Sequence, residues 1–377
     1  MADSISTLVM NCRVLVCCGA GGVGKTTTAA SLGLAAARAG RSVLVLTIDP
    51  SKRLAETMGV SPNEKEPHSP PPYFLAAAGI HPPGSLDVWM LDPRHISDTT
   101  VTRLVGEKRA QALTGNRIYQ NVTQMIAGMQ EYTAMEALYQ FVSTERYDLV
   151  ILDTPPSRNA LNFLEGPSRL GRFFDGRIFQ LFLPQKEGML RQAAGKLISR
   201  VLASVFGEAF TSEFQEFLAN FSDIFKTLTT NAEDMRALLS TDDVAFFLVT
   251  SPSPEALTEA RYFQRQTHDM ELPFRAFILN RSHALETRLR MPDVDLLGPN
   301  PSLEGQKGIE KLQALAEREK ALAIEDRALL KELDQQSGTN AIAVALPLLP
   351  GGVDDVPGLL SVSRGLMTSQ SDVAATD

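Results

Sequence analysis

Residues 19–28 constrain this chain more than any other stretch. They read Gly-Ala-Gly-Gly-Val-Gly-Lys-Thr-Thr-Thr, which satisfies the phosphate-loop pattern of Gly, four residues, Gly, Lys and Ser or Thr. The apolar run 14–18 precedes them and the alanine-rich stretch 29–39 follows, an order that predicts a strand, a glycine loop and a helix. Glycines let successive N–H groups turn toward an anion, and the helix directs the positive end of its dipole at the same point. The stretch therefore predicts a phosphate site.

Other apolar runs have the unbroken character of strands that are covered on both faces. Alternating strands and helices predict an α/β fold with a doubly wound, mainly parallel sheet. Ligands of such sheets bind beyond the carboxyl ends of the strands, and Gly19, Asp49 and Asp153 each follow the end of a predicted strand. The proline-rich residues 61–85 are expected to form an irregular surface loop. The further predicted strands are 42–48, 86–91, 147–153, 244–250, 274–279 and 341–346.

Two regions between these strands read as helices and predict an inserted α-helical subdomain. One of them carries phenylalanines at helical spacing from Phe210 to Phe225. This ridge either packs in the core of the subdomain or lines a groove for an apolar helix, and the sequence leaves both open. We expect the nucleotide-binding core to comprise residues 1–92, 147–159 and 241–377, and the helical subdomain residues 93–146 and 160–240.

Composition and charge limit the kinds of partner and the cellular compartment that we expect for this protein. The 377 residues carry a net charge of −8, a diffuse acidic balance that argues against nucleic acid as a partner. The absence of an 18-residue apolar run predicts no stable membrane insertion, and the first residues lack the basic region of a signal peptide. The three cysteines, Cys12, Cys17 and Cys18, are expected as buried thiols within the first strand. Together these features predict a cytoplasmic protein.

The polar residues at the strand ends have the chemistry that phosphoryl transfer requires. Lys25 can reach the β- and γ-phosphates, and the Thr26 hydroxyl can ligate Mg²⁺. Asp153 can hold the same ion, directly or through water, and Asp49 can orient or activate the attacking water. The competing interpretations are structural: Asp153 as a turn acid or helix N-cap, and Asp49 as the start of an Asp-Pro turn.

At these residues the chain resembles the arsenite-pump and tail-anchored-protein-targeting ATPases, which belong to the dimeric, signal-recognition-like nucleotide switches. The resemblance rests on residues 21–27, on Thr47-Ile48-Asp49-Pro50 and on Asp153-Thr154-Pro155-Pro156-Ser157. It implies a homodimer that sandwiches two ATP molecules with Mg²⁺, closing on ATP and opening after hydrolysis. It also implies that Asp49 lies in switch I and Asp153 in switch II. The implied nucleotide contacts are Gly21, Gly22, Val23, Gly24, Lys25, Thr26 and Thr27 at the phosphates, and Asn280, Pro347 and Leu348 at the adenine.

The chain departs from this family in three respects. The family's phosphate loop carries a lysine that reaches the partner's nucleotide, and Ala20 stands at that position here. Arg158, Lys52 and Arg53 flank the predicted switches and are candidates to supply the missing cation. No Cys-x-x-Cys motif is present, so we expect no zinc at a subunit interface. The helical region has no cysteine, so a thiolate site for arsenite is not expected.

The sequence therefore predicts an ATP-hydrolysing dimeric switch that couples closure to capture of a hydrophobic helical client. One alternative is a partition or positioning ATPase, which would need a basic patch or basic amphipathic tail. Residues 358–377 offer only Arg364 as a cation. Another alternative is a metabolic ligase or a reductase-activating ATPase, and the latter would need cysteines that bridge the dimer through a cluster.

Overall fold

The chain divides into two compact units. Unit 1 comprises Met1–Met90, Tyr147–Arg158 and Thr241–Asp377, and unit 2 comprises Leu91–Arg146 and Asn159–Ser240. The computed structural model describes residues 3–48, 53–62, 64–114, 129–155, 200, 203–204, 207–208, 210–214, 230–231, 233–286, 291–292, 302–349, 353 and 355–368.

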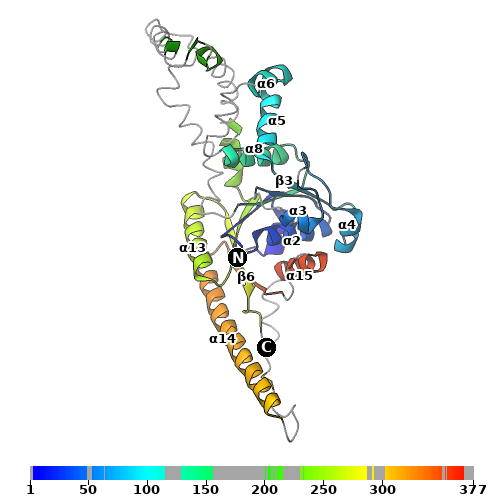
Figure 1. Ribbon diagram of the computed structural model, residues 1–377, viewed down its shortest axis with the longest axis vertical. Helices are drawn as coiled ribbons and strands as arrows, with labels where there is room; N and C mark the ends of the chain where they lie inside the picture. The colour runs from blue at the N-terminus through cyan, green and yellow to red at the C-terminus, as the bar shows by residue number, and fades with distance from the viewer. Residues whose placement is uncertain are drawn as a thin grey trace. The chain divides into compact units, whose positions relative to one another are not determined.

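Unit 1 is built on one seven-stranded sheet in the order β3-β2-β4-β1-β5-β6-β7 (Figure 1). Every pairing between neighbouring strands is parallel. This confirms the predicted α/β fold with a doubly wound parallel sheet. The strands are β1 Val14–Cys18, β2 Ser42–Thr47, β3 Ser85–Met90, β4 Leu149–Asp153, β5 Val244–Thr250, β6 Phe274–Ser282 and β7 Ile342–Pro347.

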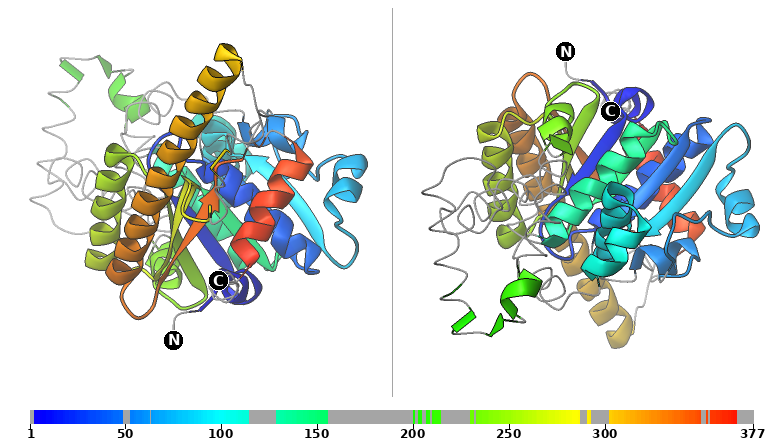
Figure 2. Two further views of the ribbon diagram at one scale, coloured as in Figure 1. Left: turned by 90° about the horizontal axis from the view of Figure 1, so that it is seen from below. Right: turned by 90° about the horizontal axis from the view of Figure 1, so that it is seen from above.

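The sheet is buried on both faces, which explains its unbroken apolar strands. In β1, all five side chains are buried, although only alternate ones, Leu15 and Cys17, belong to the main core cluster. Side chains of neighbouring strand residues point to opposite faces. The helices α1 (Ile5–Asn11), α2 (Lys25–Arg38) and α15 (Val356–Met367) lie on one face, and α13 (Pro254–Asp269) and α14 (Leu303–Ser337) lie on the other (Figure 2).

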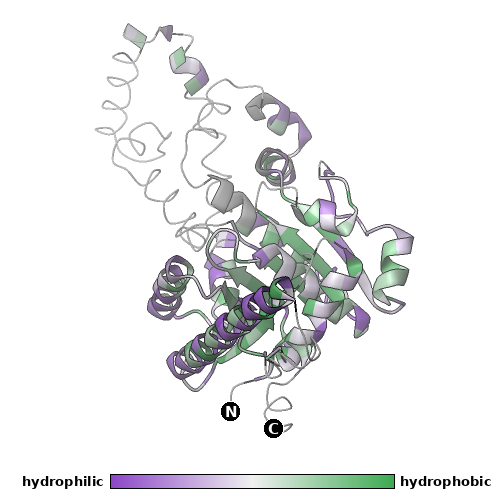
Figure 3. Ribbon diagram, turned by 60° about the horizontal axis from the view of Figure 1, so that its bottom comes forward, coloured by the Kyte–Doolittle hydropathy of each residue, from purple (hydrophilic) through white to green (hydrophobic). Residues whose placement is uncertain are grey.

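The longest helix, α14, runs for 35 residues and begins at a serine cap. The Ser302 hydroxyl accepts from Gly305 N at 3.1 Å. Only four residues of α14 are fully buried, and most of its surface is hydrophilic in Figure 3. The charged residues of α14 thus form a solvated face. Among its leucines, Leu312 and Leu315 are also about half exposed, at 52% and 53%.

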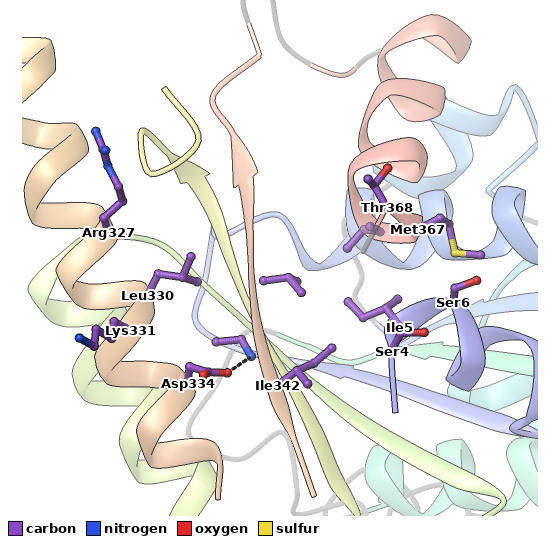
Figure 4. A pocket seen from close by; sticks show the side chains of 13 residues that line it. Ser4, Ile5, Ser6, Arg327, Leu330, Lys331, Asp334, Ile342, Met367 and Thr368 are labelled. Atoms are coloured by element: carbon purple, nitrogen blue, oxygen red, sulfur yellow. Dashed lines mark hydrogen bonds between the residues drawn. The ribbon is translucent and has the colours of Figure 1, made fainter. Parts of the chain in front are cut away.

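A cavity of about 510 Å³ lies at the outer edge of β7, where α14 and α15 flank the strand (Figure 4). Asp334 of α14 reaches this edge, and its Oδ1 accepts from the Ala343 N–H at 3.3 Å. The cavity is lined by Ile342, Ala343 and Val344 from the first half of β7. It therefore lies toward the amino ends of the strands, whereas the phosphate loop follows the carboxyl end of β1.

Unit 2 contains α5 (Pro93–Val105), α6 (Glu107–Thr114) and α8 (Met129–Ser143). Arg103 of α5 forms an ion pair with Glu136 of α8, whose side chain is only 1% exposed. Asn231 Nδ2 donates to Glu136 Oε2 at 3.2 Å, so this buried carboxylate has both a cation and an amide as partners. Of the phenylalanine ridge, Phe217, Phe221 and Phe225 lie outside the described residues.

Two local predictions were wrong or incomplete. Residues 61–85, expected as an irregular loop, contain the helix α4 (Pro72–Ala78), with proline at its first position and Gly79 as a left-handed cap. Cys12 lies outside the first strand, because it caps the carboxyl end of α1, a helix that the apolar pattern concealed. The short helix α3 comprises Arg53–Met58. In the described parts of the chain, no helix combines the length and apolar character needed to cross a membrane.

Candidate functional site

The glycine loop leaves β1 through a backbone that only glycine adopts without strain. Gly19 has φ +144°, and a Cβ at this position would meet Val249 O of β5 at 2.0 Å. Gly24 caps α2 in a left-handed conformation, with φ +97°. Gly22 also has a positive φ of +76°, but a Cβ there would meet nothing within 4 Å. The loop is therefore tightly fixed at both ends and open around Gly22, on the side where a ligand would approach.

Lys25 begins α2 directly after the loop. Its side chain is only 5% exposed, and Nζ donates to Ala20 O at 2.8 Å. The ammonium group thus lies across the loop, where its charge adds to the positive end of the helix dipole. The first turn of α2 contains no acidic residue that would offset this charge. The arrangement favours an anion such as a phosphate group.

A buried carboxylate faces the start of the same helix. Asp153 ends β4 and has no exposed surface. Its Oδ2 accepts from Thr26 Oγ1 at 2.7 Å and from Thr47 Oγ1 at 3.0 Å. The sheet register explains this meeting, because Asp153 pairs with Cys17 of β1 and with Thr47 of β2. The pattern of residue types identified Thr26 and Asp153, whereas Thr47 becomes apparent as a partner only through the register.

The donor set at this point fits Mg²⁺. A carboxylate oxygen and a threonine hydroxyl oxygen lie within hydrogen-bond distance of each other, and Mg²⁺ prefers hard oxygen ligands, several of them water or phosphate. Asp153 and Thr26 would hold the ion beside the phosphate loop. Thr154, the residue after Asp153, is anchored to β1, since its Oγ1 donates to Cys17 O at 2.9 Å. The residue that follows the carboxylate is therefore anchored to the sheet.

The thiols beside this carboxylate are buried and protonated. Burial raises the pKa of Cys18 to about 12, and burial together with Asp153 raises the pKa of Cys17 well above its ordinary value. Both thiols therefore stay protonated near neutral pH, and metals bind the thiolate form. Within the described residues, no group of three histidine, cysteine or acidic side chains is arranged to hold a metal ion.

Asn280 connects β6 to the phosphate loop. Its Nδ2 donates to Val23 O at 2.8 Å, and its Oδ1 accepts from Arg281 N at 3.0 Å. A Cβ on Gly24 would lie 2.2 Å from Asn280 Nδ2, so glycine at that position permits the contact. Because a carbonyl and an N–H hold its two ends, the orientation of the amide is fixed.

Two of the remaining predicted residues, Pro347 and Leu348, lie at the carboxyl end of β7. Pro347 ends β7 and pairs in register with Ser282 of β6, two residues beyond Asn280, while the next residue, Leu348, is 54% exposed. Asp49, Lys52 and Arg158 lie outside the described residues, as does the side chain of Arg53. The structure therefore brings together residues 19–26, Asp153 and Asn280, and leaves the predicted role of Asp49 a prediction.

Comparison with known proteins gives the same assignment as the motifs. The sequence model of the anion-transporting ATPase family matches residues 12–288. A relative from Malassezia globosa named ATPase GET3 is 28% identical over 156 residues, which are 41% of this chain and 43% of that protein. Another ATPase GET3, from Ajellomyces dermatitidis, is 26% identical over 254 residues, or 66% of this chain and 69% of that protein.

The relatives are distant, and the Malassezia globosa match spans less than half of that protein's length. The relative from Aspergillus terreus, also named ATPase get3, is 24% identical over 254 residues. The family match, in contrast, runs from the end of α1 past β6 and includes the glycine loop, Asp153 and Asn280. On that extent of match, this chain belongs to the anion-transporting ATPase family.

Proposed function

We propose that this protein is a cytoplasmic, Mg²⁺-dependent ATPase that acts as a homodimeric switch and binds a hydrophobic helical client when ATP closes the dimer. The family and the predicted phosphate loop support the ATPase part of this proposal. The observation that carries it is the contact between Thr26 and Asp153 beside a loop whose lysine is buried. A glycine-rich turn without a ligand has no need of an acid and a hydroxyl group in contact beside it.

The chain's own residues supply positioning and charge rather than covalent chemistry. The N–H groups of residues 21–24 and the ammonium of Lys25 bind phosphate oxygens and stabilise the negative charge that shifts toward the β–γ bridge. Lys25 must then exchange Ala20 O for a phosphate oxygen, a short movement of one flexible side chain. Mg²⁺, when bound, neutralises charge on the phosphates, and Thr26 with Asp153 would hold it there. Asp49 would orient the attacking water.

The proposed dimer needs a cation that reaches the partner's nucleotide, and Ala20 cannot supply one. In the resembled family, a lysine at that position reaches the partner's nucleotide. We propose that an arginine takes this role, with Arg158 and Arg53 as the candidates. A cation supplied across an interface in this way changes turnover by several orders of magnitude in other nucleotide hydrolases, about 10³–10⁵. Unchanged turnover in both Arg158→Ala and Arg53→Ala would rule out this role for either residue.

An aromatic pair in unit 2 supports the proposed client. Phe210 is 38% exposed, and its ring stacks on Phe214 with centroids 6.0 Å apart and an interplanar angle of 9°. An exposed aromatic stack on a helical face suits recognition of an apolar helix better than it suits a sealed core. ATP can drive such recognition only if it binds the closed, client-competent dimer more tightly than the open form.

Calorimetry with ATP and Mg²⁺ tests the nucleotide site directly. The intact chain should bind ATP, Lys25→Ala should lose most of that affinity, and Asp153→Asn should lose the dependence on Mg²⁺. Release of phosphate from ATP, measured in steady state, should require the same residues. If Lys25→Ala binds ATP as tightly as the unaltered chain, the proposed site is wrong.

The switch and the client require separate measurements. Sedimentation in ATP and in ADP should show a dimer that ATP favours. Purification in each nucleotide, followed by mass spectrometry, should recover an apolar helical protein with the ATP form. Phe210→Asp should reduce that recovery while leaving ATP hydrolysis and the circular dichroism spectrum unchanged. A client recovered equally from the ATP and ADP forms would refute the coupling.

A further inference from the structure

A buried carboxylate on α14 contacts the end of β6, the strand that carries Asn280, and the turn that follows it. Asp326 is 4% exposed, and its Oδ2 accepts from Ser282 Oγ at 3.0 Å and from His283 N at 2.7 Å. Ser282 Oγ accepts in turn from Ala284 N at 3.0 Å. The neighbouring His283 Nδ1 lies 2.9 Å from Oε2 of Glu319, which also belongs to α14. The turn after β6 is therefore fastened to α14 at consecutive residues.

The turn needs such an anchor because regular sheet pairing reaches it only through Ser282 and Pro347. The regular pairing of β6 with β7 is interrupted between Leu279 and Ser282, which leaves Asn280 and Arg281 without regular ladder partners. Arg281 adopts φ +57°, a left-handed conformation that is unfavourable for a residue with a side chain. A strained residue of this kind keeps its conformation only where the surroundings fix it. Asp326 fixes the residues directly after it.

The orientation that results leaves Asn280 able to pair with one base edge. Its amide uses one N–H on Val23 O and one lone pair on Arg281 N, so one N–H and one oxygen lone pair remain. Adenine offers a complementary pair of groups, the N6 amino donor and the N7 acceptor. Guanine offers two acceptors, O6 and N7, so its O6 would face the amide oxygen of Asn280.

We propose that Asp326 is a positioning residue for base selection: by anchoring the turn through Ser282 and His283, it holds Asn280 in the orientation that accepts adenine and rejects guanine. The proposal rests on the proposed function, because it takes ATP to bind at the phosphate loop. It assigns α14, which contributes no residue to the phosphate loop, a part in substrate specificity. A correctly placed bidentate amide discriminates between bases by roughly ten- to a hundred-fold.

The test compares three ligands on the full chain by calorimetry: ATP, GTP and inorganic tripolyphosphate, which carries no base. The unaltered chain should prefer ATP over GTP by about ten-fold or more. Asp326→Ala should reduce that preference to within about three-fold, with tripolyphosphate affinity unchanged. Asp326→Asn keeps an acceptor oxygen and should retain most of the preference. The matched control is Glu325→Ala, which removes an exposed carboxylate from the adjacent position of α14 and should leave all three affinities unchanged.

Each outcome separates this proposal from the function on which it rests. A folded Asp326→Ala that keeps the full preference for ATP overturns the proposal alone, as does an unaltered chain that binds ATP and GTP equally. An unaltered chain that binds neither ATP nor tripolyphosphate overturns the proposed function as well. Should Asp326→Ala fail to fold, Ser282→Ala decides the matter, because it removes one of the two contacts. A wild-type ratio of affinities in Ser282→Ala would then overturn the positioning role.

Discussion

At the scale of single residues, the site is organised around the buried carboxylate of Asp153. Burial of this polar group is unfavourable, and hydrogen bonds from hydroxyl groups offset that cost. Asp153 is fully buried, and its carboxylate accepts from Thr26 of α2 and from Thr47 of the neighbouring strand β2. Hydrogen bonds to a charged acceptor contribute more than those between neutral groups, about 1.5–3 kcal/mol each. The two threonines therefore have different roles. Thr26 can exchange its bond to Asp153 for a ligand when one binds, whereas Thr47 keeps its bond to Asp153.

Replacing Thr47 tests this division. Thr47→Val keeps the shape of the side chain but removes the donor to Asp153, so we expect the free energy of unfolding to fall by about 1.5–3 kcal/mol. Thr28→Val is the matched control, because Thr28 is also fully buried and its Oγ1 has no hydrogen-bond partner among the described residues. That substitution should be neutral or slightly stabilising. Urea unfolding of both variants gives the comparison, and equal losses would contradict the assigned role of Thr47.

The buried thiols predict a dependence of stability on alkaline pH. The pKa of Cys18 is raised from 9.0 to about 12, so the folded chain keeps this proton where the unfolded chain releases it. The contribution to stability is present below pH 9.0 and is lost as the pH rises toward 12. The free energy of unfolding should therefore fall over this range, and less steeply in Cys18→Ala. Alkylation of native protein at pH 8 that is as fast as in urea would contradict the burial.

At the scale of elements, sequence patterns predicted what depends on local spacing and missed what depends on register. Unbroken apolar runs located β1, β2, β4 and β5, because burial on both faces leaves a strong signal. The run that located β3 is interrupted by Asp87. Thr47 gave no such signal: its role follows from lying beside Asp153 in the sheet. The bond from Asn280 to Val23 joins residues 257 positions apart, and that of Asp326 to the β6 turn has no local pattern either. The helix α4 was missed because prolines favoured a loop, although Pro72 starts it.

The packing of α2 on the sheet depends on a glycine within the helix. A Cβ at Gly33 would lie 2.6 Å from Val45 Cγ2 and 3.4 Å from Leu86 Cδ1. Alanine is favoured over glycine in a helix by about 0.8–1 kcal/mol, but overpacking a core costs about 1–3 kcal/mol. We therefore expect Gly33→Ala to lower the free energy of unfolding despite its better helix propensity.

A second glycine allows the effect of helix propensity to be measured without a change in core packing. Gly308 lies in α14, and a Cβ there would meet nothing within 4 Å beyond the helix itself. Gly308→Ala should therefore raise the free energy of unfolding by about 0.5–1 kcal/mol. Chemical unfolding of the two variants in parallel measures both effects. Stabilisation by Gly33→Ala would show that α2 can move away from the sheet, and would contradict the close packing described here.

At the scale of the whole molecule, the predicted nucleotide contacts are confined to one unit. The glycine loop, Asp153, Asn280 and Asp326 all belong to unit 1, whereas the stacked pair Phe210 and Phe214 belongs to unit 2. A protein that merely binds ATP needs no response in unit 2. A switch that captures a client does, because a ligand shifts a conformational equilibrium only through a difference in its affinity for the two states.

Hydrogen exchange in the presence and absence of ATP and Mg²⁺ distinguishes these two possibilities. Bound nucleotide should slow exchange in β1, the loop and α2, since ligand binding to the folded form suppresses opening there. In a switch, exchange in α5 and α8 of unit 2 should change as well, and ADP should produce a different pattern from ATP. Lys25→Ala should abolish both responses together, because both originate in the phosphate site. Slower exchange in unit 1 with no change in unit 2 would leave an ATP-binding protein without the coupling that capture of a client requires.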